Sequence, residues 1–185
     1  MCNLWKRIKE SWNHKESRIT DEHDYKNVVK APVGFVDLGL PSGLLWAEKQ
    51  EEGYYTHEEA VKKYGEALPQ PEEFVELWRV CKWDWDKKRK GYTVTGPNGN
   101  SIFLAASGYR LRASGDLDGV GSYGGYWSST PGSATEAYGL YFNASTVLPL
   151  LSNYRECGFS VLQVRRSLLK TFARIYLDRY GWQSL

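Results

Sequence analysis

Apolar positions along the chain follow two spacings, and they predict two helices and a series of short strands. The segment Thr56-His-Glu-Glu59 has the pattern of a capping box, which places Thr56 at a helix N-cap. A second helix is expected to start near Pro71, because the first position of a helix needs no backbone N–H. The inward-facing residues expected on the two helices are Ala60, Val61 and Tyr64, and Phe74, Leu77, Trp78 and Cys81.

Short runs bounded by glycine, proline and asparagine predict the strands. They are expected at residues 34–38, up to 46–47, 91–96, 101–107, 126–130, 137–143 and 158–164. Residues 97–100, with the sequence Pro-Asn-Gly-Asn, favour a hairpin turn. Two helices followed by strands that are separated by turns predict an α+β domain.

The two ends of the chain have a different pattern. Residues 3–17 and 167–180 each carry an apolar stripe at helical spacing with a mainly basic opposite face. We therefore expect an N-terminal helix and linker over 1–31, one domain over 32–166 and a C-terminal helix over 167–185. The terminal helices could pack on each other or form an oligomer through a neighbouring subunit.

The region from 124 to 161 alternates residues that resemble a scaffold with residues that share no chemistry. The run Leu148-Pro-Leu-Leu151 shows neither strand alternation nor a helical repeat, because Pro149 interrupts it. Exposed leucines cost solubility unless they bind something. The alternative interpretation is an irregular loop folded under a satellite core. The expected scaffold residues are Trp127, Phe142, Arg155 and Phe159.

Several motifs in a fixed order resemble one bacterial family. They are Phe35–Leu44 with Trp46-Ala47, Gly91–Leu104, Gly108-Tyr-Arg110, Gly124-Gly-Tyr-Trp-Ser-Ser-Thr130 and Gly158-Phe-Ser-Val161. Over residues 33–165 the chain resembles the Fibrobacter succinogenes major paralogous domain family. More narrowly, it is similar to the variable proteins of diversity-generating retroelements.

This resemblance implies a C-type lectin-like fold of two helices plus short antiparallel strands, to which the N- and C-terminal helices are added. In such proteins a retroelement rewrites adenines of a C-terminal repeat, so that asparagine codons become codons for many residues. The resemblance implies a variable region over about 125–165 that lines an exposed ligand-binding surface. The ligand-binding residues it implies are Gly125, Gly139, Tyr141, Ala144, Thr146, Leu148, Leu150, Leu151, Ser152, Tyr154 and Cys157.

The amino-acid composition and net charge favour a recognition function and give no reason to expect nucleic-acid binding. Eight tryptophans and thirteen tyrosines offer large, rigid contact area that suits recognition. A net charge of +2 gives no electrostatic reason to expect nucleic acid as a partner. No segment is long and apolar enough to span a membrane, and no signal peptide is visible. We expect a protein or glycan ligand on a target cell surface, with the chain itself on a phage virion or on a cell surface that it reaches by a non-classical route.

Catalytic chemistry is not indicated, and we expect no enzyme, no catalytic or metal-binding residue and no cofactor. Cys81 lies on a predicted buried stripe and Cys157 at an arbitrary position, and neither has an assignable base. The three histidines, including His57, lack metal-ligand spacing and are expected to be solvated. Two alternatives remain open: a catalytic relative of formylglycine-generating enzymes on the same fold, and a structural component of a phage tail.

Overall fold

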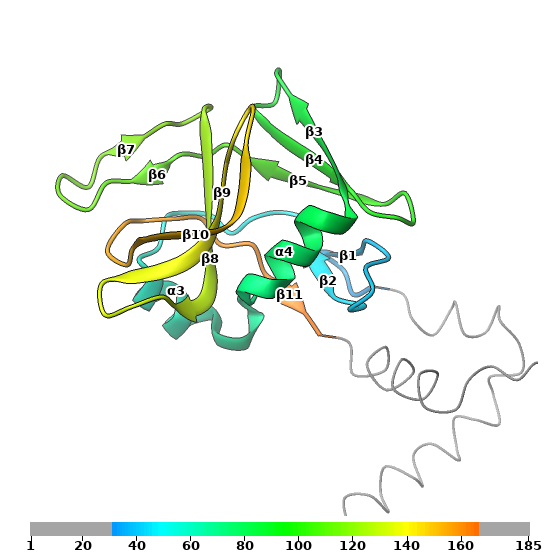
Figure 1. Ribbon diagram of the computed structural model, residues 1–185, viewed down its shortest axis with the longest axis horizontal. Coiled ribbons are helices and arrows are strands. Elements are labelled where there is room, and N and C mark those ends of the chain that lie inside the picture. Colours follow the sequence, from blue (N-terminus) through cyan, green and yellow to red (C-terminus); the bar gives the residue numbers. More distant parts are fainter. Residues whose placement is uncertain (1–30, 167–185) are drawn as a thin grey trace, which may run out of the picture. The chain divides into compact units, whose positions relative to one another are not determined.

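The computed structural model describes residues 31–166, which form two short α-helices, one 3-10 turn and eleven strands (Figure 1). In chain order the elements are β1 (Phe35–Asp37), β2 (Leu45–Ala47), α3 (His57–Tyr64), η1 (Gly65–Ala67), α4 (Pro71–Val80), β3 (Lys82–Asp86), β4 (Gly91–Thr95), β5 (Ser101–Ala105), β6 (Tyr109–Arg110), β7 (Leu117–Asp118), β8 (Tyr123–Pro131), β9 (Glu136–Asn143), β10 (Val147–Tyr154) and β11 (Val164–Arg165). The helices predicted at 3–17 and 167–180 lie outside the described residues.

Local signals place the starts of both helices correctly. At α3 the Thr56 side chain accepts from the Glu59 backbone N at 3.3 Å, and the Glu59 carboxylate accepts from the Thr56 backbone N at 2.8 Å. Helix α4 begins at Pro71, and Glu73 accepts from the Gln70 backbone N at 2.7 Å. These contacts satisfy N–H groups that the first turn of a helix leaves without partners.

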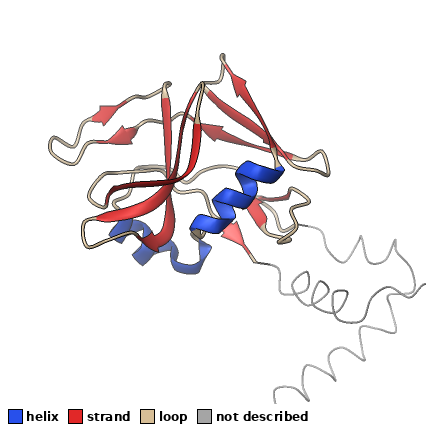
Figure 2. Cartoon of the chain, viewed as in Figure 1, coloured by secondary structure: helices blue, strands red, loops and turns tan. Residues whose placement is uncertain are grey.

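The strands form four small sheets, and all pairings between them are antiparallel. The three-stranded sheets have the orders β1-β2-β11, β10-β9-β8 and β3-β4-β5, and β6 pairs with β7. Strands make up most of the regular structure, as Figure 2 shows. The predicted α+β class is therefore wrong, because the described chain is β-rich and its two helices span only eight and ten residues.

Several strands that the sequence pattern did not predict account for this difference, and β3 and β10 are the longest of them. Strand β3 follows α4 directly, and its two tryptophans, Trp83 and Trp85, pack against the core while Asp84 between them is exposed. Strand β10 contains Pro149, which argues against a strand unless the strand lies at a sheet edge. At residues 158–164 a strand was predicted, but the structure has only isolated bridges at 158–160 and the start of β11 at Val164.

Two clusters of buried residues hold the described chain together. In the larger cluster, side chains of α4 meet those of the sheets β3-β4-β5 and β10-β9-β8, with Phe74, Leu77, Leu104, Leu140 and Phe142 fully buried. In the smaller cluster, Trp127 and Phe159 pack with residues of α3 and with Cys157. Helix α4 lies along the sheet β10-β9-β8, which is therefore supported on one face (Figure 1). Neither described helix has the length and apolarity that crossing a membrane requires.

Candidate ligand-binding surface

The β9–β10 hairpin carries most of the residues for which the sequence predicts ligand binding. On β9, Leu140 and Phe142 are fully buried, whereas Tyr141 between them is half-buried on the other face. This placement follows the two-residue period of a strand, because successive side chains point to opposite faces. The core side of the hairpin is thus occupied by the scaffold.

Strand β10 presents apolar side chains to solvent. Leu148, Leu150 and Tyr154 are 41%, 51% and 49% exposed, and Ser152 is exposed between them. The run lies in a strand, in which exposed and partly buried residues alternate from Val147 to Tyr154. A register shift between Leu148 and Leu151 accommodates the proline.

The strand lies at a sheet edge, which explains how it tolerates Pro149. Strand β9 is on one side of β10, and no other strand of the described residues pairs with its other side. A proline cannot donate a ladder hydrogen bond, so a free edge is where it costs least. The exposed leucines and the open edge therefore occur together.

The predicted ligand-binding residues do not share one face of the hairpin. Leu148 is opposite Tyr141, and Leu151 is opposite Gly139. Ser152 is opposite Tyr138, whose side chain points to the other face of β9 than those of Gly139 and Tyr141. The expected single patch is thus divided between two faces that meet at the β10 edge. We call the accessible residues of this hairpin the hairpin surface: Tyr141, Ala144, Thr146, Leu148, Leu150, Leu151, Ser152 and Tyr154.

Aromatic rings extend one face of the hairpin surface onto neighbouring strands. Tyr141 stacks on Tyr123 of β8, with ring centroids 5.6 Å apart and planes 24° apart. Tyr109 donates a hydrogen bond to the Asp118 carboxylate at 3.0 Å. Burial, followed by the nearby Tyr123, Tyr109 and Asp118, raises the pKa of Tyr141 to about 12. The Tyr141 phenol is therefore protonated at neutral pH and available as a hydrogen-bond donor.

Charged residues border the other end of β10. The Arg112 guanidinium carbon lies 4.7 Å from the centre of the Tyr154 ring, and Arg112 pairs with Glu156 at 3.3 Å. All three side chains are largely exposed. A cation above an aromatic ring orients that ring, so Tyr154 is presented with limited freedom.

The β9–β10 turn is organised by one side chain. The Asn143 side-chain oxygen accepts from the backbone N atoms of Ser145 and Thr146 at 2.9 and 3.0 Å. Ala144 and Thr146, which the sequence predicts as ligand-binding residues, are exposed in this turn. Ser152 donates to the Glu136 carboxylate at 2.8 Å.

Three of the predicted ligand-binding residues are not on the surface. A Cβ at Gly125 would lie 3.1 Å from the Phe159 ring, and a Cβ at Gly139 would lie 2.6 Å from the Tyr126 carbonyl oxygen. Cys157 is buried in the smaller cluster. The expectation that Gly139 is exposed is wrong, because close packing of β8 on β9 leaves no room there for a side chain.

The expected scaffold residues form contacts beneath and beside the hairpin. Trp127 stacks on Phe159 with centroids 4.4 Å apart, and both rings are buried. Arg155 binds the β8–β9 loop through two backbone oxygens: its side chain donates to Ala134 O at 3.4 Å, and its backbone N donates to Thr135 O at 2.9 Å. Arg155 therefore fastens the end of β10 to the preceding loop.

His57 is a scaffold residue that sequence reasoning missed. It is only 2% exposed, and its ring contacts Trp127 edge-on, so the expectation of a solvated histidine is wrong. Its backbone N donates to Arg155 O at 2.9 Å, and its Nε2 donates to Ser128 O at 3.2 Å. Burial and then the charge of Arg155 lower the pKa of His57, although the Ser128 hydrogen bond opposes them. The sequence pattern did not indicate this role, because His57 lies within the capping box, where only Thr56 and Glu59 are expected to form contacts.

The two described cysteines are packing residues. Burial and the nearby Glu76 raise the pKa of Cys81 to about 11, and burial also raises the pKa of Cys157. Both thiols are therefore protonated at neutral pH, whereas a nucleophile or a metal ligand requires the thiolate. Residues 31–166 contain no group of three histidine, cysteine or acidic side chains placed to hold a metal ion.

Residues 75–163 match a protein family described as "Domain of unknown function (DUF8237)". The match begins within α4 and ends just before β11, so it includes the whole of the sheets β3-β4-β5 and β10-β9-β8. No curated protein and no solved structure matches the chain.

Proposed function

We propose that this chain is a binding protein whose hairpin surface is diversified by a retroelement and recognises a macromolecule on a target cell. The observation that carries the proposal is the exposure of Leu148, Leu150 and Tyr154 on one edge strand. Large apolar side chains exposed along one accessible strand are a feature of interaction sites. The motifs that resemble the retroelement variable proteins supply the mechanism of diversification.

The division between scaffold and surface supports this proposal. Trp127, Phe142 and Phe159 are completely or almost completely buried and form the support of the hairpin. The side chains of the hairpin surface can change without altering those contacts. Such a surface would bind as an antibody paratope does, through rigid aromatic anchors and shape complementarity. We place the protein on a virion or on a cell surface.

The decisive experiment is to sequence the gene together with its neighbourhood. We expect a nearly identical repeat beside a reverse-transcriptase gene, with differences at adenines of the template. Those differences should fall in codons of the hairpin surface and spare the codons for Trp127, Phe142 and Phe159. Changes distributed evenly over all four bases, or concentrated in the buried codons, would remove the retroelement from the proposal.

A second experiment tests recognition itself. Arrays of bacterial surface proteins and glycans would be probed with the full chain and with the double variant Leu150→Ser/Tyr154→Ser. The control is Leu117→Ser, which changes an exposed leucine on β7. We expect the double variant to lose binding at least about tenfold. Equal binding by all three proteins would place recognition elsewhere on the molecule.

A further inference from the structure

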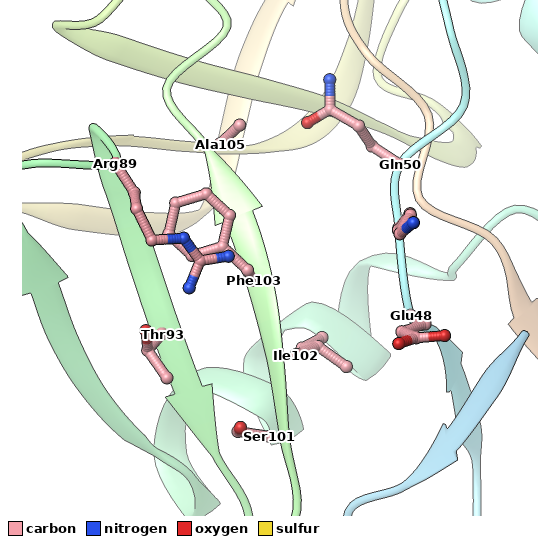
Figure 3. Close-up of a pocket in the computed structure, with 9 residues that line it drawn as sticks. Glu48, Gln50, Arg89, Thr93, Ser101, Ile102, Phe103 and Ala105 are labelled. Atoms are coloured by element: carbon pink, nitrogen blue, oxygen red, sulfur yellow. The ribbon is translucent and has the colours of Figure 1, made fainter.

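A pocket of about 340 Å³ lies apart from the hairpin surface, between the β4–β5 strands and the segment that follows β2 (Figure 3). Thr93 and Phe103 are directly opposite each other on β4 and β5, so their side chains share one face. Tyr92 and Leu104 point the other way, into the larger core cluster. The outer face of the β4–β5 pair thus forms one wall of the pocket, and residues 48–50 form the other.

A stacked arginine is the main feature of the first wall. The Arg89 guanidinium carbon lies 3.6 Å from the centre of the Phe103 ring, and Figure 3 shows the group lying across the ring. The turn that precedes β4 holds the Arg89 backbone, because the Asp86 carboxylate accepts from the Arg89 backbone N at 2.9 Å. A Cβ at Gly91 would lie 2.6 Å from the ring, so glycine makes room for Phe103. The stack restricts the guanidinium before any ligand arrives.

Among residues 31–166, no side chain forms an ion pair with this guanidinium. An arginine held flat by an aromatic ring still presents its donors along its edge, in the fork that fits a carboxylate. The Thr93 and Ser101 hydroxyls also line this wall. The wall thus offers one cationic fork and two hydroxyl groups.

The second wall consists of Gln50, whose side chain is held by hydrogen bonds, and of the charged residues Glu48 and Lys49. The Gln50 side chain accepts from the Tyr126 hydroxyl at 2.5 Å and donates to Ser160 Oγ at 3.4 Å. Glu48 and Lys49 are exposed beside it, and Glu48 N donates to Gly34 O at 2.9 Å. Because opposite charges are adjacent, this wall does not select an ammonium group. Glu48 can accept hydrogen bonds from hydroxyl groups and repels a doubly charged phosphate.

We propose that this pocket binds a small acidic sugar. The carboxylate would lie on the edge of Arg89, and the ring hydroxyls would meet Thr93, Ser101 and Glu48. The volume is near the lower end of small-molecule sites, which begin at about 300 Å³, and therefore suits a single sugar unit. The proposal does not depend on the function of the hairpin surface, since no residue of β8, β9 or β10 lines the pocket.

The test is a titration of the full chain, labelled with ¹⁵N, by sodium glucuronate, with glucose, glycine and inorganic phosphate as comparison probes. We expect saturable shifts at the amides of Thr93 and Ser101, with glucuronate binding at least about tenfold more tightly than glucose. Arg89→Gln should weaken glucuronate binding by a similar factor. Lys88→Gln removes a charge from the same turn without lining the pocket and should change the affinity less than about twofold.

Four results would overturn the proposal: no saturable shift up to about 50 mM glucuronate, equal binding of glucose, tighter binding of glycine or phosphate, or an equal loss with Lys88→Gln. Thermal unfolding of Arg89→Gln checks that the stack is not required for folding. If that variant unfolds, Arg89→Lys and Ser101→Ala replace it. Both should weaken glucuronate binding, and unchanged affinity in both would equally reject the site.

Discussion

Trp127 is a buried residue that is held both by ring stacking and by a hydrogen bond from its indole N–H. Its ring stacks on Phe159, and its Nε1 donates to the Tyr55 carbonyl oxygen at 2.7 Å. Leu150 is its opposite, an apolar side chain with half of its surface in solvent. The energetic role of each residue follows from this burial rather than from its residue type.

The first prediction compares these two residues. Trp127→Ala should lower the free energy of unfolding by about 3–5 kcal/mol, because a large buried ring is lost and a cavity remains. Leu150→Ser should change it by less than about 0.5 kcal/mol. Denaturant unfolding followed by circular dichroism measures both values. A large loss in Leu150→Ser would show that β10 packs more tightly than its exposure indicates.

His57 predicts a pH dependence of stability. Burial, and then Arg155, hold its pKa below the ordinary 6.5 in the folded chain, so the unfolded chain binds a proton more readily. The contribution of neutral His57 to the free energy of unfolding is therefore fully present above pH 6.5 and is lost as the pH falls toward the lowered pKa. For this one group the loss is at most about 1.4 kcal/mol per pH unit.

The measurement is the free energy of unfolding at several pH values for the natural chain and for His57→Gln. The variant should be less stable at high pH but should lose less stability on acidification. The difference between the two curves isolates His57 from the other histidines. Parallel curves would mean that His57 has no lowered pKa in the folded chain.

At the scale of elements, β10 combines exposed leucines with an open edge. An unpaired edge strand is a template for association with another chain, and proline is one of the residues that prevent it. Pro149 and the adjacent register shift interrupt the edge in its middle. We expect these two features to hinder pairing of β10 with a second copy of the chain.

The corresponding prediction concerns Pro149→Val, which restores a backbone donor and favours a continuous strand. We expect increased self-association, measured by light scattering as a function of concentration. Leu148→Val is the control, since it keeps the proline while adding a β-branched residue to the same strand. Equal behaviour of Pro149→Val and the natural chain would show that the register shift alone protects the edge.

At the scale of the whole described chain, the β1-β2-β11 sheet and the β3-β4-β5 sheet meet at a glycine. A Cβ at Gly96 would lie 2.0 Å from the Leu38 carbonyl oxygen. In the same turn, the Asn98 and Asn100 side chains donate to the Asp37 carbonyl oxygen at 2.8 and 2.9 Å. The β4–β5 turn therefore joins these two sheets by backbone contact.

Gly96→Ala should disturb this junction and lower the stability of the whole unit by about 1–3 kcal/mol, because backbone atoms cannot move aside as a side chain can. Thermal unfolding measures the loss. Gly132→Ala is the matched control, since its Cβ would have no atom closer than 3.3 Å and should cost less than about 0.5 kcal/mol. Equal midpoints for the two variants would contradict a tight junction.

The sequence predicted those parts of the fold and the site that depend on nearby residues. The capping box at Thr56, the proline that begins α4 and the turn at 97–100 all act within a few residues, and each lies where the pattern predicts it. The burial of Trp127, Phe142 and Phe159 was also predicted, because large apolar residues in strands rarely remain exposed.

Properties that depend on distant partners could not be predicted in this way. Whether Pro149 can lie in a strand depends on which side of the sheet is open, and whether Gly139 is accessible depends on how closely β8 approaches. The burial of His57 depends on Trp127 and Ser128, about seventy residues away. The sequence alone determined where elements begin and turn, because those signals are local, whereas tertiary packing decided which strands are edges and which side chains reach solvent. Pairing between strands also made the described chain β-rich, since β3 and β10 each form a ladder with the strand next to them in the chain.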